Sequence, residues 1–395
     1  MPFLTIPHII LSIGIHEYGK VILAQTYVVF FGVIVNFGFE NYGVVKVAQV
    51  KHNKTELSAV LSAITIIRLF VLIIAFVIYF LIFRSVLKTQ IEFDLALLSF
   101  CTLIEAVLVP IWLYVGLGAF RKLLYVYMFS KIISTLLIFV LIRPGIDITY
   151  IPIIYFIGSL VACIISIYFI SYCFVIRLRR VSRKYLFDYV RNCQAYLWSN
   201  LAITTYRYGL VLVLGIVSEV RFVNFFIVSD KFFKIFQSGL SPLNEVLFSR
   251  YAQVGEIGSF KTLYHDNKKK IYYLLTVISV YCLFLALAAK KILFIFNIFE
   301  NEIIRNLRIM TIAVFFGFCN YILGIIILNS TGFKIYFMKS VMIVVLLSAL
   351  ILICLGSTYE DLGASITVVL SEFFLFLFLI NRVLKESTRI SSFHD

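Results

Sequence analysis

Long apolar segments alternate with short polar ones along the whole chain. A helix rises ~1.5 Å per residue, so about 20 apolar residues cross the ~30 Å hydrocarbon core of a membrane. A shorter apolar segment, Met1–Leu11, is interpreted as the second half of a first helix that is truncated in this sequence. The pattern predicts eleven further, full spans: Val21–Val44, Ser58–Phe83, Leu95–Ala119, Leu123–Ile142, Tyr150–Ile176, Leu197–Val217, Val220–Arg250, Ile271–Phe296, Met310–Leu328, Ile335–Leu355 and Gly363–Ile380.

Composition narrows the fold class. Of the 395 residues, 62% are hydrophobic and only 14% are charged, which is far more apolar than a soluble domain needs. A membrane β-barrel would show short alternating segments, whereas these apolar runs are long and continuous. The sequence therefore predicts an all-α polytopic membrane protein.

The net charge is +15, and what matters for the interpretation is where the basic residues lie along the chain. The basic residues gather in alternate short loops, and the positive-inside rule places such loops in the cytoplasm. We therefore interpret the charge as a topology signal and expect no nucleic-acid partner. The predicted cytoplasmic side holds the C-terminal tail and the loops containing Lys46, Arg121, Arg177, Lys261 and Lys334.

The most basic loop, Arg177–Arg191, divides the spans into six and six. We predict an N-terminal helical bundle over 1–176, a basic cytoplasmic linker over 177–196, and a C-terminal helical bundle with a short tail over 197–395. A weak repeat about 200 residues apart, Gly14–Glu17 against Gly215–Glu219, agrees with a transporter built from two related bundles.

Signatures of soluble enzymes are absent from the sequence. The seven cysteines are scattered without a CxxC pair, and the five histidines form no HExxH motif. Neither a phosphate-binding P-loop nor a GxSxG motif occurs. We expect no metal, no cofactor and no enzymatic activity.

The predicted span Val220–Arg250 carries the candidate chemistry. Its polar positions, from Lys231 through Lys234 to Glu245, recur every three or four residues and so lie on one stripe of a helix. A charge near the bilayer centre costs ~3 kcal/mol or more, so such residues usually face a bundle interior or a wet cavity. Arg207, on the preceding span, is expected at similar depth. The candidate substrate-binding residues are Arg207, Lys231 and Lys234, with Arg68 and Lys131 as weaker candidates.

Two other interpretations of these cations remain open. Asp230 could simply form an ion pair with Lys231 or Lys234, or the long side chains could snorkel toward the interface. The carboxylates Asp230, Glu245 and Glu40 are candidates for coupling to an ion gradient, with Glu105 and Glu372 as further acids of the same kind. Each of these acids could instead be paired with a base or lie near the interface.

Several stretches resemble the Wzx-type polysaccharide (O-antigen) flippases, within the multidrug/oligosaccharidyl-lipid/polysaccharide exporter superfamily. They are Pro7 to Gly19, which includes a turn from Gly14 to Gly19; Asn36-Phe37-Gly38-Phe39; Asp230-Lys231, followed by Leu247-Phe248; and Asn320 to Lys334. Asn36 stands where the family usually has Asp, so this position lacks the family's carboxylate.

The resemblance implies two six-helix bundles around a central cavity, in the bacterial inner membrane. It implies transport of an undecaprenyl-pyrophosphate-linked oligosaccharide repeat unit from the inner to the outer leaflet, for surface polysaccharide synthesis. Membrane lipids and the polysaccharide polymerase machinery are then expected partners. A cationic cavity would suit the pyrophosphate, because Arg or Lys offsets its desolvation.

Two alternatives belong to other functional classes. A multidrug exporter of the same superfamily would favour acids over cations in its cavity, if its drugs are cationic. A membrane polysaccharide polymerase has similar hydropathy but carries a large external loop, which this chain lacks.

Overall fold

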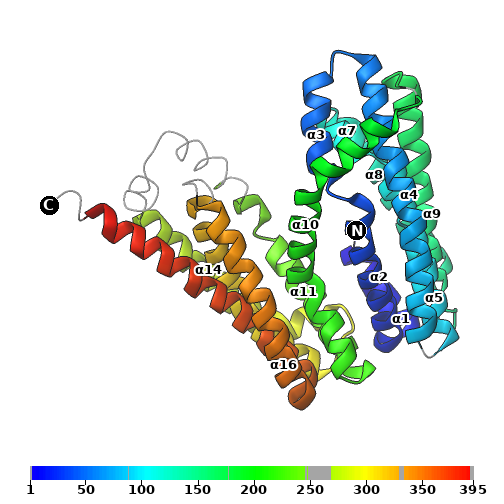
Figure 1. The fold of residues 1–395 in the computed structure, drawn as a ribbon. Helices are drawn as coiled ribbons and strands as arrows, with labels where there is room; N and C mark the ends of the chain where they lie inside the picture. Colours follow the sequence, from blue (N-terminus) through cyan, green and yellow to red (C-terminus); the bar gives the residue numbers. More distant parts are fainter. Residues whose placement is uncertain are drawn as a thin grey trace. The chain divides into compact units, whose positions relative to one another are not determined.

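The computed structural model describes residues 2–87, 89–176, 178–244, 247, 268–328 and 333–391, and this part of the chain is helical without a single strand (Figure 1). The prediction of an all-α fold is therefore confirmed. The chain forms two compact units, residues 1–205 and 206–395, with the boundary inside one long helix.

The first unit contains the helices α1 to α9, the π-helix η1 and the first part of α10. Their bounds are α1 (Pro2–Ile13), α2 (Ile15–Asn36), α3 (Phe39–Val50), α4 (Lys54–Val86), α5 (Gln90–Cys101), α6 (Ile104–Leu108), α7 (Ile111–Gly116), α8 (Phe120–Leu141), α9 (Tyr150–Tyr168), the π-helix η1 (Phe169–Cys173) and α10 (Arg183–Val217).

The second unit begins within α10. It continues with α11 (Val220–Ser238), α14 (Lys268–Ile295), α15 (Asn301–Asn320), the π-helix η2 (Tyr321–Leu328) and α16 (Lys334–Ser391).

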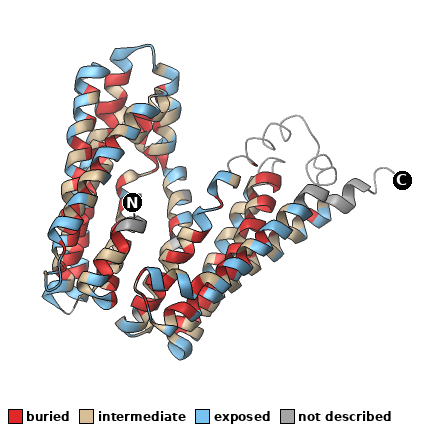
Figure 2. Cartoon of the chain, turned by 180° about the vertical axis from the view of Figure 1, so that it is seen from behind, coloured by how far each residue is buried: buried red, intermediate tan, exposed pale blue. Residues whose placement is uncertain are grey.

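Eight segments of the described chain are long and apolar enough to cross a membrane. They overlap most of every predicted full span except Leu197–Val217 and Val220–Arg250, which correspond to α10 and α11. Figure 2 shows buried residues on the inner faces of the helices and exposed ones on the outer faces. On α4 the exposed side chains include Phe70, Ile73 and Leu81, as expected for a helix that faces lipid. The protein is therefore a multi-pass membrane protein.

The last of these segments, within α16, is folded back on itself. Glu360 has a non-helical backbone (φ 52°) and separates two antiparallel halves. The hydroxyl of Tyr336 in the first half donates to the carbonyl oxygen of Phe378 in the second, at 3.0 Å. This break lies within the turn predicted between the last two spans.

Two helix interruptions in the first unit occur at a glycine and at a proline. The left-handed conformations of Phe37 and Gly38 separate α2 from α3, and Pro110 separates α6 from α7. Proline lacks an N–H and disfavours a helical residue before it, so a break at Pro110 is expected. The predicted turn from Gly14 to Gly19 is wrong in length, because α2 already begins at Ile15.

The predicted continuous helix Val220–Arg250 is also wrong. Helix α11 ends at Ser238, and Gly239 and Leu240 form a turn. Glycine is a poor helix former, and Pro242 shortly afterwards suits a new helix start better than a helix interior. Glu245 lies outside the described residues.

Candidate functional site

The candidate site is built on the hairpin of α10 and α11. Only Ser218 and Glu219 separate the two helices, which agrees with the break between the predicted spans Leu197–Val217 and Val220–Arg250. The Ser218 hydroxyl donates to the carbonyl oxygen of Gly356 at 2.9 Å and so holds this turn against α16. Further along the hairpin, Lys234 Nζ lies 4.0 Å from the centroid of the Tyr208 ring. The two helices are therefore side by side at the level of the predicted cations.

An ion pair occupies the centre of this hairpin. Lys234 Nζ lies 2.5 Å from Asp230 Oδ2, one helical turn earlier on α11. The Asp230 side chain is 13% exposed and the Lys234 side chain 31%, so the lysine is the more accessible partner. The pairing left open by the sequence is thus present between Asp230 and Lys234. A substrate role for Lys234 stays a prediction.

Of the other two predicted cations, Lys231 and Arg207, the structure describes the side chain of Lys231 alone. Lys231 is half-buried on α11, beside the buried Phe232 and Phe233. Arg207 lies on α10, but its side chain is outside the described part of the chain. The structure therefore brings Lys231, Lys234 and Asp230 together on one helix.

The weaker candidates lie in the first unit. Arg68 is only 1% exposed; its Nη1 donates to the carbonyl oxygen of Ala106 at 2.7 Å, and its guanidinium carbon lies 6.0 Å from the Phe39 ring centroid. This burial does not fit snorkelling along the outside of the bundle. Glu40 is half-buried at the start of α3, and Lys131 is exposed on α8. Their roles in binding or ion coupling stay predictions.

A buried carboxylate links α15 to α16 in the second unit. The side-chain amide of Asn320 donates to Glu372 Oε2 at 2.7 Å and to the Glu372 carbonyl oxygen at 2.9 Å. The Tyr206 side chain on α10 lies near the same carboxylate. The sequence singled out Glu372 only as one acid among several. Little in the sequence indicated its partner Asn320, which is an amide side chain within an apolar segment.

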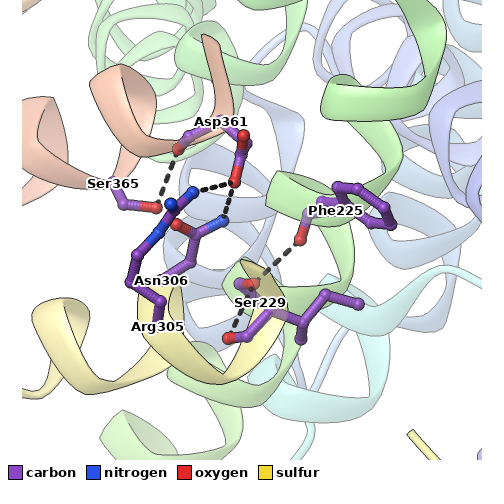
Figure 3. A network of polar contacts seen from close by, with 7 residues as sticks. Phe225, Ser229, Arg305, Asn306, Asp361 and Ser365 are labelled. Atoms are coloured by element: carbon purple, nitrogen blue, oxygen red, sulfur yellow. Dashed lines mark hydrogen bonds and ion pairs between the residues drawn. The ribbon is translucent and has the colours of Figure 1, made fainter. Parts of the chain in front are cut away.

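A second polar network is shown in Figure 3. Asp361 accepts a hydrogen bond from Asn306 Nδ2 at 2.6 Å and pairs with Arg305 at 3.1 Å. Asn306 and Asp361 lie outside the predicted spans, in the polar segments 297–309 and 356–362, yet Asn306 is part of α15 and both side chains are buried. Helix α15 already begins at Asn301, and Asn306 is fully buried while Asp361 is 2% exposed.

A separate group of polar contacts joins α11 to α15. The Ser229 hydroxyl donates to the carbonyl oxygen of Phe225 at 2.8 Å and contacts that of Ile303 at 3.4 Å (Figure 3). Ser365 donates to the Asp361 carbonyl oxygen at 3.0 Å. One end of the second unit is therefore held by polar contacts among α11, α15 and α16.

Comparison with known proteins identifies the family of this chain. A family model described as "Polysaccharide biosynthesis protein" matches residues 1–254, well over half of the chain. The chain belongs to the polysaccharide biosynthesis protein family. This confirms the family resemblance drawn from the sequence.

One curated relative and two solved structures extend the comparison. A protein of Escherichia coli (strain K12) named "Putative O-antigen transporter" is 22% identical over 377 residues, covering 94% of this chain and 90% of the relative. An inward-facing multidrug resistance MATE family transporter of the MOP superfamily is 13% identical, with a TM-score of 0.73 over 98% of this chain and 95% of that one. A MOP superfamily transporter from Pyrococcus furiosus is 15% identical, with a TM-score of 0.57 over 100% of this chain and 96% of that one.

The two structures show the fold alone, which is that of MOP superfamily transporters. The relatives are named as transporters, and this confirms the prediction that the chain is not an enzyme. The polymerase alternative gains no support from them.

Proposed function

We propose that this protein moves a lipid-linked oligosaccharide repeat unit from the inner to the outer leaflet of the bacterial inner membrane, for O-antigen or a related surface polysaccharide. The carrier lipid is undecaprenyl pyrophosphate. Support comes from the family, from the name of the E. coli relative, and from a fold shared with membrane transporters. The mechanism is alternating access, which needs helical bundles and no catalytic group.

The observation that carries the proposal is the half-accessible lysine of the α10–α11 hairpin. Lys234 keeps 31% of its side chain exposed although it forms an ion pair with Asp230. Lys231 adds a second cation three residues earlier on α11. A pyrophosphate must leave water to cross hydrocarbon, and charge-assisted hydrogen bonds from lysines offset that cost. Lys234 Nζ covers one face of the Tyr208 ring, so only the opposite face is left for a sugar ring to stack on.

Gene deletion followed by complementation tests the proposal. We expect lipid-linked repeat units to accumulate on the cytoplasmic leaflet while surface polysaccharide disappears, and re-expression to reverse both changes. Single repeat units that reach the surface without being polymerised would indicate a polymerase instead. Normal polysaccharide together with altered drug sensitivity would indicate a drug exporter, and either result would overturn the proposal.

A further inference from the structure

A polar cavity of about 720 Å³ lies at one end of the first unit. It is formed where α3 ends, α4 begins and α10 begins, and Figure 1 shows α3 and the start of α10 at the same end. Its volume is within the usual range for small-ligand sites. The loops at this end are those that the positive charge places in the cytoplasm. The cavity has no part in the α10–α11 site, which belongs to the second unit.

Tyrosine side chains form a preassembled side of this cavity. The rings of Tyr42 and Tyr189 meet edge to face with centroids 5.3 Å apart. The hydroxyls of Tyr185 and Tyr189 are 3.0 Å apart, and Asn192 Nδ2 donates to the Tyr42 hydroxyl at 3.3 Å. Tyr189 is only 4% exposed, so this group is packed into the unit. Such rings and amides are suited to stacking on sugars and to hydrogen bonding with their hydroxyls.

Charges of both signs line the same cavity. Lys46, Arg179 and Arg180 contribute three cations, while Glu56 and Asp188 contribute two carboxylates. Cations in this number suit a phosphate group, through charge-assisted hydrogen bonds. A bare anion would be repelled by the two carboxylates, but sugar hydroxyls would donate to them. The mixture therefore fits a phosphorylated sugar better than a simple anionic headgroup.

The N-terminus of α4 is not the anion site. Its first turn lies beside the cavity, but Asn53 Oδ1 already accepts hydrogen bonds from the backbone N–H groups of Thr55 and Glu56. A phosphate in this cavity would thus depend on the side-chain cations. This makes the site testable by neutralising those cations alone.

An apolar cavity of about 310 Å³ is lined in part by the same two segments. Val60 and Arg179 line the polar cavity, whereas the adjacent residues Leu61 and Leu178 line the apolar one. The backbone N–H of Arg179 donates to the Ser62 hydroxyl at 2.7 Å and holds this segment against α4. A polar head cavity beside an apolar chain cavity is the arrangement that an amphiphile requires.

We propose that these two cavities bind a glycolipid whose sugar is attached through phosphate, with the head in the polar cavity and the first part of the chain in the apolar one. This inference rests on the proposed function for the identity of the lipid. The site is a docking position on the predicted cytoplasmic side, reached before the substrate meets the lysines of α11.

Binding to the full-length protein in phosphatidylcholine nanodiscs tests the inference. The probes are undecaprenyl-pyrophosphoryl-N-acetylglucosamine, soluble N-acetylglucosamine 1-phosphate and phosphatidylglycerol, with dissociation constants measured by native mass spectrometry. We expect the glycolipid to bind at least about tenfold more tightly than either other probe, a difference of ~1.4 kcal/mol or more. We expect K46Q/R180Q to weaken glycolipid binding by about tenfold or more, since charge-assisted hydrogen bonds are lost.

The matched control is K51Q/K54Q. Lys51 directly follows α3 and Lys54 is the first residue of α4; both are exposed and do not line the cavity. The control variant loses the same charge as K46Q/R180Q. Equal weakening in both variants would reduce the effect to general surface charge and overturn the inference. Equally tight binding of phosphatidylglycerol, or of the soluble sugar phosphate, would also overturn it, as would absent glycolipid binding.

Failure of this inference is distinguishable from failure of the proposed function. If the deletion strain loses surface polysaccharide but K46Q/R180Q binds and exports normally, the docking site is wrong and the flippase proposal stands. If the deletion strain keeps its polysaccharide, the flippase proposal fails whatever the cavity binds.

Discussion

The amide nitrogen of Asn320 lies 2.7 Å from the carboxylate of Glu372, 52 residues further along the chain. Asn320 is the last residue of α15, directly before the helix widens into the π-helix η2. Both side chains are buried, at 5% and 8% exposure. The pair therefore fixes the end of α15 against the second half of α16 at a point where the regular helix hydrogen bonding changes.

Replacing Asn320 with Ala is expected to destabilise the protein. It removes two hydrogen bonds and leaves a buried carboxylate with fewer donors, at a cost of about 1–3 kcal/mol. The measurement is the midpoint of thermal unfolding in detergent. The matched control is Asn301→Ala, an exposed asparagine at the start of the same helix, for which we expect little change. Equal midpoints for the two variants would contradict a stabilising role for the Asn320–Glu372 pair.

The Asp361 network predicts a graded series of effects. Arg305 is 47% exposed in its side chain, so Arg305→Ala should cost about 1 kcal/mol or less. Asn306 is fully buried, and Asn306→Ala should cost about 1–3 kcal/mol. Asp361→Ala should cost more than either single change, because it leaves both partners without their acceptor. The same thermal midpoints test the order, and a larger loss for Arg305→Ala than for Asn306→Ala would contradict it.

The sequence was sufficient for the fold class and the hairpin. Uninterrupted apolar segments of membrane-crossing length indicate helices whatever their partners, and a polar break near residue 218 indicates the turn between α10 and α11. The Asp230–Lys234 pair was also predictable from the sequence, because residues four apart on a helix are neighbours. Local spacing thus accounts for what was predicted correctly.

Contacts between distant segments were not predictable in this way. Asn306 and Asp361 are 55 residues apart, and each was assigned to a polar loop because nothing local indicates burial. Their burial follows from the packing of α15 on α16, which helical periodicity does not specify. The early end of α11 was missed for a related reason: the apolar pattern continues past Gly239 although the backbone does not.

Gly38 provides a prediction about backbone conformation. It has φ +77°, and a Cβ placed there would lie 2.5 Å from Tyr196 Cβ and 2.9 Å from the Leu197 backbone nitrogen. Gly38→Ala should therefore combine a left-handed backbone penalty of roughly 1–2 kcal/mol with an overpacking cost of about 1–3 kcal/mol.

Gly118 is the matched control for Gly38. Its φ is +69°, but an added Cβ has no atom within 4 Å, so Gly118→Ala should carry only the backbone penalty. We expect a clearly lower unfolding midpoint for Gly38→Ala than for Gly118→Ala. Closely similar midpoints would contradict the predicted overpacking of Gly38→Ala against Tyr196 and Leu197 of α10.

Variants of the Asp230–Lys234 pair distinguish a role of this pair in packing from a role in transport. Lys234→Gln alone leaves the Asp230 charge largely buried without its partner, which should lower both protein abundance and export. The double variant D230N/K234Q removes both charges and should recover abundance. If Lys234 contacts the pyrophosphate, export by the double variant should stay at least about tenfold below wild type, because a charge-assisted hydrogen bond contributes ~1.5–3 kcal/mol.

The control for this experiment is a second neutralised pair. Lys20 and Glu17 form an ion pair at 2.8 Å in the first unit; Lys20 is 29% exposed, close to Lys234, and Glu17 is 37% exposed, more than Asp230. The variant E17Q/K20Q should keep both abundance and export near wild type, because such a partly exposed pair contributes little. Export is measured as surface polysaccharide per unit of membrane-inserted protein. Full export by D230N/K234Q would show that the pair serves packing alone, and the pyrophosphate contact would then have to lie elsewhere.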